Sequence, residues 1–260
     1  MGRVYLIGAG PGDPELLTIK AARLLASADI VLYDSLVSQE ILALISPGAE
    51  KIAVGKRAGQ KLLTQDEINS LLVSYAAHRE IVVRLKGGDP GIFGRAGEEI
   101  AALRAAHVAF EIVPGITAAL GAAAAAGLSL TDRRVAAQVL FTTFSRGSDA
   151  NQMDWGCLTA ATTLVLYMPG TNYAELGQRL LDGGLPTELP CAIISNATRA
   201  SQEIRFTTIS HLLTDKTLPA PALVIVGRVA AHDVSDLSTQ FWSAEQQAKQ
   251  DRQISQATLI

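Results

Sequence analysis

The chain has 260 residues, 48% of them hydrophobic, and a net charge of −3 at pH 7. That length and composition are typical of a globular protein with one large or two modest α/β domains. The pI near 5.8 excludes a general attraction to nucleic acid or to an acidic membrane, so an anionic ligand must meet locally placed Arg and Lys side chains.

The cysteine content and the N-terminal sequence indicate the cellular compartment in which the protein is expected. Cys157 and Cys191 are far apart and have no His or Cys at metal-ligand spacing, which predicts buried, reduced thiols without a disulfide or a zinc site. The N-terminus has no basic segment before a long apolar core, and the alanine-rich run Thr117–Leu130 is too short to cross a bilayer. We therefore expect a cytoplasmic protein with no membrane partner.

The first part of the chain alternates strand-like and helix-like segments. Apolar runs typical of strands fall at Val4–Ile7, Ile30–Leu32, Ile52–Val54, Ile81–Leu85 and Phe110–Val113. Helical patterns lie between them, at Pro14–Ser27, Ser38–Ile45, Gln65–Ala77 and Ala96–Ala106. Thr64 and Glu67 have the spacing of a capping box at the start of the third helix. The alternation predicts a mainly parallel sheet wrapped by helices.

A second set of the same kind follows. Its predicted strands are Gln138–Thr142, Thr163–Tyr167, Ala192–Ser195, Ile204–Thr207 and Ala222–Val226, with helices near Ile116–Ala126, Tyr173–Leu181 and Thr208–Leu213. The fold class is therefore α/β, with two consecutive α/β domains at 1–115 and 116–238, each with a mainly parallel sheet. The polar, Gln-rich tail 239–260 predicts a frayed helix or disorder.

The first strand runs directly into Gly8-Ala9-Gly10-Pro11-Gly12-Asp13-Pro14. Glycine lets the backbone approach a ligand or adopt positive φ, and the prolines fix the path of the loop. A dinucleotide-binding turn would read G-x-G-x-x-G and enter a helix at once. Because the third glycine is missing here, a ligand without phosphate is favoured. A βα connection with no ligand explains this motif alone equally well.

Two further loops follow predicted strand ends, Arg84-Leu85-Lys86-Gly87-Gly88-Asp89-Pro90-Gly91-Ile92-Phe93-Gly94-Arg95 and Val113-Pro114-Gly115-Ile116-Thr117-Ala118-Ala119. Ligands of open α/β sheets bind beyond the carboxyl ends of the strands, so these loops point to one site. Small side chains in the second of them allow a flat or bulky ligand to lie against the backbone. Turn formation and close helix–sheet packing are the structural alternatives.

The blocks GAGPGDPELLT, YDSLV, VGKR, RLKGGDPGIFGRAGEE, VPGITAA, LTDRR and TLVLYMPG, in this order, resemble those of uroporphyrinogen-III C-methyltransferases. These enzymes belong to the tetrapyrrole (precorrin) methylase superfamily, and the resemblance covers about residues 2–228. It implies the tetrapyrrole methylase fold, with the active site in a cleft between two α/β domains, and a homodimer. It also implies transfer of methyl groups from S-adenosylmethionine to C2 and C7 of uroporphyrinogen III. The products would be S-adenosylhomocysteine and, via precorrin-1, precorrin-2, a precursor of siroheme, heme d1 and cobalamin.

The resemblance also implies the residues of the methyl-donor site. Carried over one by one, they are Pro11, Gly87, Gly88, Asp89, Ile92, Thr117, Ala118, Met168 and Ala197. Without the resemblance, Met168 at the end of a predicted strand would be interpreted as a core residue. The four histidines are scattered along the chain, so no metal is expected.

Asp34 and Lys56 each follow a predicted strand, and the resemblance implies a proton acceptor and a proton donor, respectively. Two solvated loop charges are the structural alternative. The acceptor is a polycarboxylate and needs cationic partners, for which guanidinium groups are suited. The resemblance assigns Arg95, Glu98 and Arg133 to substrate binding and makes Arg95 a catalytic candidate as well. The alternative is an ion pair at the start of a helix, between Arg95 and either Glu98 or Glu99.

Some positions depart from the family pattern on the acceptor side. The family reads Thr-Gly-His where this chain has Thr143-Phe144-Ser145, and LTHR appears as Leu130-Thr131-Asp132-Arg133. Lys86, Arg57 and Arg134 are weaker candidates for acceptor binding. The alternatives are a later precorrin methylase, a methylase of RNA or protein, and a non-catalytic tetrapyrrole-binding protein. The acidic pI argues against RNA, so the expected partners are a small-molecule tetrapyrrole and a second copy of the chain.

Overall fold

The computed structural model describes residues 2–55, 63–144, 155, 158–159 and 161–231. The chain divides into two compact units that are both discontinuous in sequence. Unit 1 comprises Met1–Gly127, Ile194–Ile204 and Leu218–Leu223, and unit 2 comprises Leu128–Ile193, Arg205–Thr217 and Val224–Ile260. The domain limits that the sequence suggests, at 115 and 238, remain predictions.

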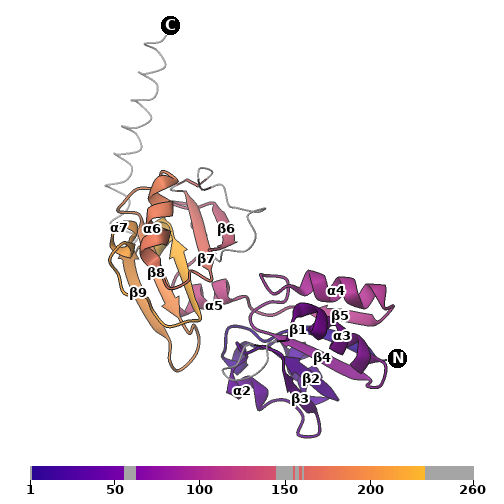
Figure 1. Cartoon of the computed structure of the whole chain (residues 1–260). Coiled ribbons are helices and arrows are strands. Elements are labelled where there is room, and N and C mark those ends of the chain that lie inside the picture. The colour runs from indigo at the N-terminus through magenta and orange to yellow at the C-terminus, as the bar shows by residue number, and fades with distance from the viewer. Residues whose placement is uncertain (1, 56–62, 145–154, 156–157, 160, 232–260) are drawn as a thin grey trace, which may run out of the picture. The chain divides into compact units, whose positions relative to one another are not determined.

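The first sheet has five strands in the order β3-β2-β4-β1-β5, and all neighbouring strands are parallel (Figure 1). The strands are β1 (Arg3–Gly8), β2 (Ile30–Tyr33), β3 (Glu50–Ala53), β4 (Ile81–Lys86) and β5 (Ala109–Val113). The helices of this part are η1 (Pro14–Leu16, 3-10), α1 (Ile19–Ala26), α2 (Gln39–Leu42), α3 (Gln65–Ala76), α4 (Ala96–Ala105) and α5 (Ala118–Ala125). The parallel α/β architecture that the alternation predicts is confirmed.

Helix boundaries depend on the capping side chains. The segment predicted as one helix over Pro14–Ser27 is interrupted, because Leu17 is extended and Thr18 begins a new helix, its hydroxyl accepting a hydrogen bond from the Ala21 amide at 3.1 Å. The capping box predicted for α3 is confirmed. The Thr64 hydroxyl accepts from the Glu67 amide at 3.2 Å, and the Glu67 carboxylate accepts from the Thr64 amide at 2.7 Å.

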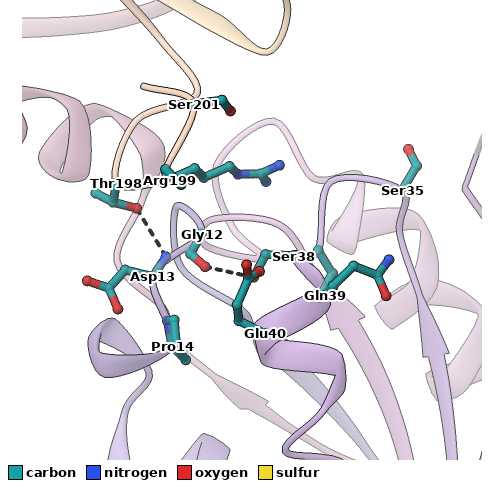
Figure 2. Close-up of a pocket in the computed structure, with 12 residues that line it drawn as sticks. Gly12, Asp13, Pro14, Ser35, Ser38, Gln39, Glu40, Thr198, Arg199 and Ser201 are labelled. Atoms are coloured by element: carbon teal, nitrogen blue, oxygen red, sulfur yellow. Dashed lines mark hydrogen bonds between the residues drawn. The ribbon is translucent and has the colours of Figure 1, made fainter. Parts of the chain in front are cut away.

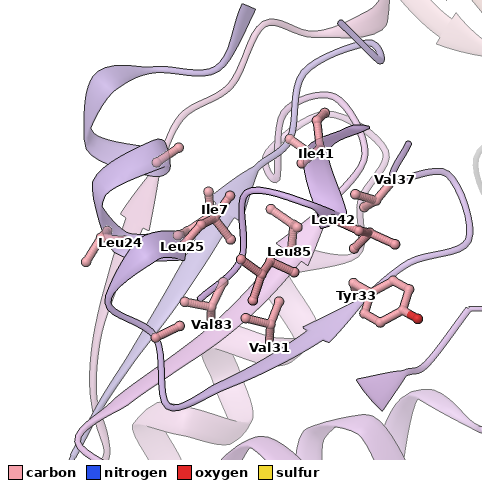
Figure 3. Packing of buried hydrophobic residues seen from close by; sticks show 14 of the residues in the cluster. Ile7, Leu24, Leu25, Val31, Tyr33, Val37, Ile41, Leu42, Val83 and Leu85 are labelled. Carbon is pink, nitrogen blue, oxygen red and sulfur yellow. The ribbon is translucent and has the colours of Figure 1, made fainter. Parts of the chain in front are cut away.

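Helices bury both faces of the first sheet, and the alternation of side chains along each strand decides which helix they meet. On one face α1 and α2 pack on the cluster shown in Figure 3, which includes Ile7, Leu24, Leu25, Val31, Ile41, Leu42, Val83 and Leu85. On the other face α3 and α4 pack on a second cluster, which includes Val4, Leu6, Ile30, Leu32, Leu72, Val82 and Leu103. Successive residues of β4 therefore point to different helices.

The second sheet has the strand order β6-β7-β10-β8-β9, and β6 and β7 are parallel. The strands are β6 (Gln138–Thr143), β7 (Thr162–Tyr167), β8 (Pro190–Ser195), β9 (Glu203–Thr208) and β10 (Ala222–Val226), and the helices are α6 (Tyr173–Asp182), α7 (Ile209–Leu212) and η4 (Arg228–Ala230, 3-10). Cys191 in β8 is free and buried, and burial raises the pKa of its thiol. Cys157 lies outside the described residues.

In the portion of the chain that the structure describes, no helix combines the length and the apolar character that a membrane span requires.

Candidate functional site

The three glycine-containing loops lie at the carboxyl ends of neighbouring strands, β4, β1 and β5. Gly10 and Gly88 exchange backbone hydrogen bonds, from Gly10 N to Gly88 O at 3.1 Å and from Gly88 N to Gly10 O at 2.8 Å. A Cβ atom on Gly115 would lie 2.4 Å from Gly88 O, and one on Gly8 would lie 2.6 Å from Gly115 N. The loops meet through bare backbone, in a space that accommodates no side chain at Gly8 or Gly115.

Asp89 fixes the path of the loop after β4. One carboxylate oxygen accepts from Gly91 N at 2.8 Å and the other accepts from Gly115 N at 3.0 Å, so this side chain ties the β4 and β5 loops together. Gly88, with a φ of 67°, approaches the start of α5, where its missing Cβ would lie 3.5 Å from Ala118 N. Unit 1 contains all but one of the residues expected at the donor site: Pro11, Gly87, Gly88, Asp89, Ile92, Thr117, Ala118 and Ala197.

The other expected donor residue, Met168, belongs to unit 2 and follows β7. It has a φ of 48° and is 49% exposed, so the alternative interpretation of Met168 as a core residue is wrong. Arg133 also belongs to unit 2 and is exposed. Its neighbour Arg134 pairs with Asp132 at 2.6 Å and lowers the pKa of that carboxyl to about 2. The cation of Arg134 is therefore engaged within its own turn.

A cluster of charges lies beneath α4, at the ends of β2 and β4. Arg84 and Lys86 alternate with residues of the other face, so both point toward the helix. Fully buried Glu99 of α4 accepts from Arg84 Nε and from Lys86 Nζ, both at 2.9 Å. Arg84 Nη2 donates to Asp34 at 2.5 Å. One guanidinium thus joins the two carboxylates.

The environment of the cluster shifts the pKa values of its two cations in opposite directions. Burial opposes the charge of Arg84, but Asp34 and Glu99 together raise the pKa of this guanidinium. Burial and the nearby Arg84 lower the pKa of Lys86, although Glu99 acts in the other direction. The Asp34 side chain is 28% exposed, so the carboxylate is held from inside while solvent still reaches it. The alternative of a fully solvated loop charge is wrong for Asp34.

Arg84 and Glu99 are residues that the sequence reasoning missed as parts of this site. The signal was two cations, at positions 84 and 86, on a strand that reads as buried on both faces. A buried cation requires a buried acidic partner, and the acidic pair at the start of the following helix, Glu98 and Glu99, offered one. Lys86, a weaker candidate for acceptor binding, is instead buried in this cluster.

Arg95 and Glu98 form the ion pair that was the structural alternative for these residues. Arg95 precedes α4 with a φ of 55°, and its Nε and Nη2 donate to the two oxygens of Glu98, both at 2.7 Å. The pairing raises the pKa of Arg95 and lowers that of Glu98. Both side chains are exposed, so an incoming carboxylate can reach the N–H groups of Arg95 that Glu98 does not engage. Lys56 lies outside the described residues.

A cavity of about 560 Å³ opens in unit 1 (Figure 2). Its lining includes Gly12, Ser35 and Thr198, which are the chain neighbours of Pro11, Asp34 and Ala197. Two hydrogen bonds cross its wall. Asp13 N donates to the Thr198 hydroxyl at 3.1 Å and the Ser38 hydroxyl donates to Gly12 O at 2.7 Å. The cavity therefore adjoins three separate positions that the resemblance singles out.

The described residues contain no group of three or more His, Cys, Asp and Glu side chains that could hold a metal ion. The chemistry available around the cavity and the glycine loops is instead that of backbone amides, hydroxyls, carboxylates, among them Asp34 and Asp89, and several guanidinium groups. Such a set can bind a flat organic ligand against the backbone and can move a proton at Asp34.

Comparisons with known proteins agree with the geometry. The family described as Tetrapyrrole (Corrin/Porphyrin) Methylases matches residues 3–213. Uroporphyrinogen-III C-methyltransferase of Paracoccus denitrificans is 47% identical over 236 residues, which cover 89% of this chain and 82% of that protein. The crystal structure of uroporphyrin-III C-methyl transferase from Thermus thermophilus complexed with S-adenyl homocysteine is 39% identical, with a TM-score of 0.76. That match covers 88% of this chain and 98% of the Thermus chain.

A second group of relatives is longer. Siroheme synthase of Actinobacillus pleuropneumoniae is 47% identical over 232 residues, which cover 88% of this chain and 48% of the synthase. The chain thus spans about half the length of the siroheme synthases that it matches.

Proposed function

We infer the activity of this chain from its family, because it belongs to the tetrapyrrole (corrin/porphyrin) methylases. We propose that it is an S-adenosylmethionine-dependent C-methyltransferase that methylates C2 and C7 of uroporphyrinogen III and yields precorrin-2 via precorrin-1. The observation that carries the proposal is the 47% identity to the Paracoccus uroporphyrinogen-III C-methyltransferase, which extends over 82% of that protein. The Thermus structure with S-adenyl homocysteine supports the choice of methyl donor.

The proposed donor site comprises Pro11, Gly87, Gly88, Asp89, Ile92, Thr117, Ala118, Met168 and Ala197. Its support is the junction of the glycine loops, where three segments meet through bare backbone, together with the exposure of Met168. The thioether of Met168 is soft and polarisable, which suits a contact with the sulfonium group of the methyl donor. No metal is required, because the methyl group of a sulfonium ion is already an electrophile.

The reaction needs positioning and one proton acceptor. A pyrrole carbon of the acceptor attacks the methyl carbon, the C–S bond breaks, and its electron pair stays on sulfur to give S-adenosylhomocysteine. The ring system then loses a proton, for which Asp34 is the proposed acceptor, with Lys56 as proton donor. Holding the reactants in line supplies most of the acceleration, since effective molarities reach roughly 10⁵–10⁸ M. Arg84 fixes the Asp34 carboxylate from the protein side.

Acceptor carboxylates are assigned to Arg95 and Arg133, with Glu98 orienting Arg95. The two-point pair of Arg95 with Glu98 supports this, because an exposed guanidinium already held in one plane loses less entropy on binding a carboxylate. The neighbour of Arg133, Arg134, is already paired with Asp132, so Arg133 is the residue of this turn that we assign to the acceptor. We further propose a homodimer in the cytoplasm, with no nucleic-acid or membrane partner.

The test is anaerobic incubation of the purified protein with uroporphyrinogen III and methyl-labelled S-adenosylmethionine. The mass of the oxidised tetrapyrrole should increase by two methyl groups, with label transferred from the donor. Transfer of no label, in protein that still binds S-adenosylhomocysteine, would contradict the acceptor and leave the donor site in place. In that case other precorrins, RNA and protein are the acceptors to try.

A further inference from the structure

The loop after β8 carries two residues with positive φ. Asn196 and Thr198, on either side of Ala197, have φ values of 47° and 64°. Asparagine adopts this left-handed conformation readily, but a β-branched threonine does so only where surrounding contacts fix it. Ala197, a proposed donor contact, therefore depends on whatever fixes Thr198.

Several contacts hold this loop within unit 1. Thr198 accepts from Asp13 N at 3.1 Å, and Thr198 N donates to the Gln202 side chain at 2.7 Å. The Arg199 guanidinium reaches two other segments: its Nε donates to Pro11 O at 3.4 Å and its Nη2 donates to Leu36 O. One side chain thus connects the loops that follow β8, β1 and β2.

The chain makes room for this side chain at Gly12. A Cβ atom at Gly12 would lie 2.6 Å from Arg199 Cγ and 2.7 Å from Nε, and the φ of Gly12 is 153°. Figure 2 shows the extended Arg199 side chain beside Gly12 at the wall of the cavity. Burial lowers the pKa of Arg199, with Glu40 as the opposing influence. The Arg199 guanidinium is therefore half-buried, and its hydrogen bonds described above go to backbone carbonyls.

We propose that Arg199 is a positioning residue for methyl-donor binding, which holds the Pro11 and Ala197 loops in their binding geometry by donating to Pro11 O and Leu36 O. This rests on the proposed function, because Pro11 and Ala197 are donor contacts only if that function is right. Lysine cannot replace arginine here, since a guanidinium offers donors in a fixed plane to two carbonyls and an ammonium is a single point.

The test uses Arg199→Ala and Arg199→Lys, with Arg205→Ala as the matched control. Arg205 also donates to a backbone carbonyl, that of Lys216, but outside this loop. Titration calorimetry with S-adenosylhomocysteine should give a Kd about tenfold higher for Arg199→Ala, in the range found for residues that act indirectly on a ligand. Arg199→Lys should also bind more weakly than the wild type, and the control should bind normally. KM for the donor should rise more than kcat falls.

A merely structural role for Arg199 would lower the melting temperature and the fraction of protein that binds, while the Kd of the binding fraction would not change. A Kd within about twofold of the wild type, in either folded Arg199 variant, would overturn the proposal. Arg199→Lys keeps the charge and the stem, so it provides the measurement if Arg199→Ala fails to fold. A wild-type protein that binds no S-adenosylhomocysteine would overturn the proposed function itself, whereas normal wild-type binding with unaffected variants overturns only the role of Arg199.

Discussion

Asp34 follows the end of β2, and its carboxylate is held from the protein interior. The hydrogen bond from Arg84 fixes its orientation, and Glu99 with the carbonyls of Leu32 and Leu85 fixes Arg84 in turn. A carboxylate in this arrangement is oriented by its ion pair with Arg84, as a general base requires, while part of it stays accessible from solvent. The arrangement supports the catalytic role proposed for Asp34.

Asp34→Asn should lower kcat by about 10²–10⁴-fold, which is the usual contribution of a general base, without abolishing turnover, because positioning of the reactants remains. The Kd for S-adenosylhomocysteine should stay close to that of the wild type. Single-turnover methyl transfer measures the first effect and calorimetry the second. Asp182→Asn, which changes an exposed carboxylate on α6, is the control. A normal rate in Asp34→Asn would exclude this carboxylate as the proton acceptor.

Glu99→Gln should destabilise the protein by about 3–5 kcal/mol, because it leaves Arg84 and Lys86 buried without their shared anion. Glu98→Gln, one position earlier on the same helix, changes an exposed pair and should alter stability by less than about 1 kcal/mol. Urea denaturation of the two variants measures the difference. Equal stability of both variants would mean that the buried cluster contributes nothing to the fold.

Among the structural elements, the strands were the most predictable from the sequence. The inner strands of the first sheet, β1, β2 and β4, are largely buried on both faces, so their apolar runs are nearly continuous and easily distinguished from loops. Helix ends were less predictable, because they depend on which hydroxyl group caps the first turn. Thr64 could be predicted as a cap from the spacing of Glu67, whereas Thr18 caps a helix in the middle of an otherwise continuous helical pattern.

The junction of the three glycine loops leads to a prediction about α5 and the loop before it. Gly115→Ala should destabilise unit 1 by about 1–3 kcal/mol and weaken S-adenosylhomocysteine binding, because the new methyl group would displace the Gly88 carbonyl. Gly97→Ala in α4 is the matched control, since nothing lies within 4 Å of its Cβ position. That change should stabilise the protein by about 0.4–1 kcal/mol. The free energy of unfolding of both variants is measured by urea denaturation. A gain in stability in both would contradict the close approach of Gly115 to the Gly88 carbonyl.

For the molecule as a whole, part of the candidate site was predictable and part was not. The three loops were visible, because parallel strands bring their carboxyl ends to one edge of a sheet. The contacts of Thr198 and Arg199 with the loop after β1 could not be predicted from the sequence, because these residues lie far along the chain in a segment that returns to unit 1. Likewise, the pairing of Arg84 with both Asp34 and Glu99 depends on the register of β2 and β4, which no local pattern specifies.

Because the proposed donor site lies mainly on unit 1, S-adenosylhomocysteine should raise the temperature at which that unit unfolds. At a hundred times its Kd the ligand adds about 2.7 kcal/mol to the stability of the bound state. For a protein of this size, that corresponds to roughly 5–10 °C in Tm. Scanning calorimetry with and without ligand measures the shift, and adenosine is the control ligand. An unchanged transition at saturating ligand would place the donor elsewhere.

The discontinuity of unit 1 has a consequence for the order in which the protein matures on the ribosome. The first sheet is complete once Val113 has been synthesised, but Ala197 and Arg199 follow much later, after most of unit 2. At about 5–20 residues per second, the nascent sheet waits several seconds with its glycine loops uncovered. A nascent chain of this protein cannot acquire its complete donor site until the first segment of unit 2, Leu128–Ile193, has been translated and the chain has returned to unit 1.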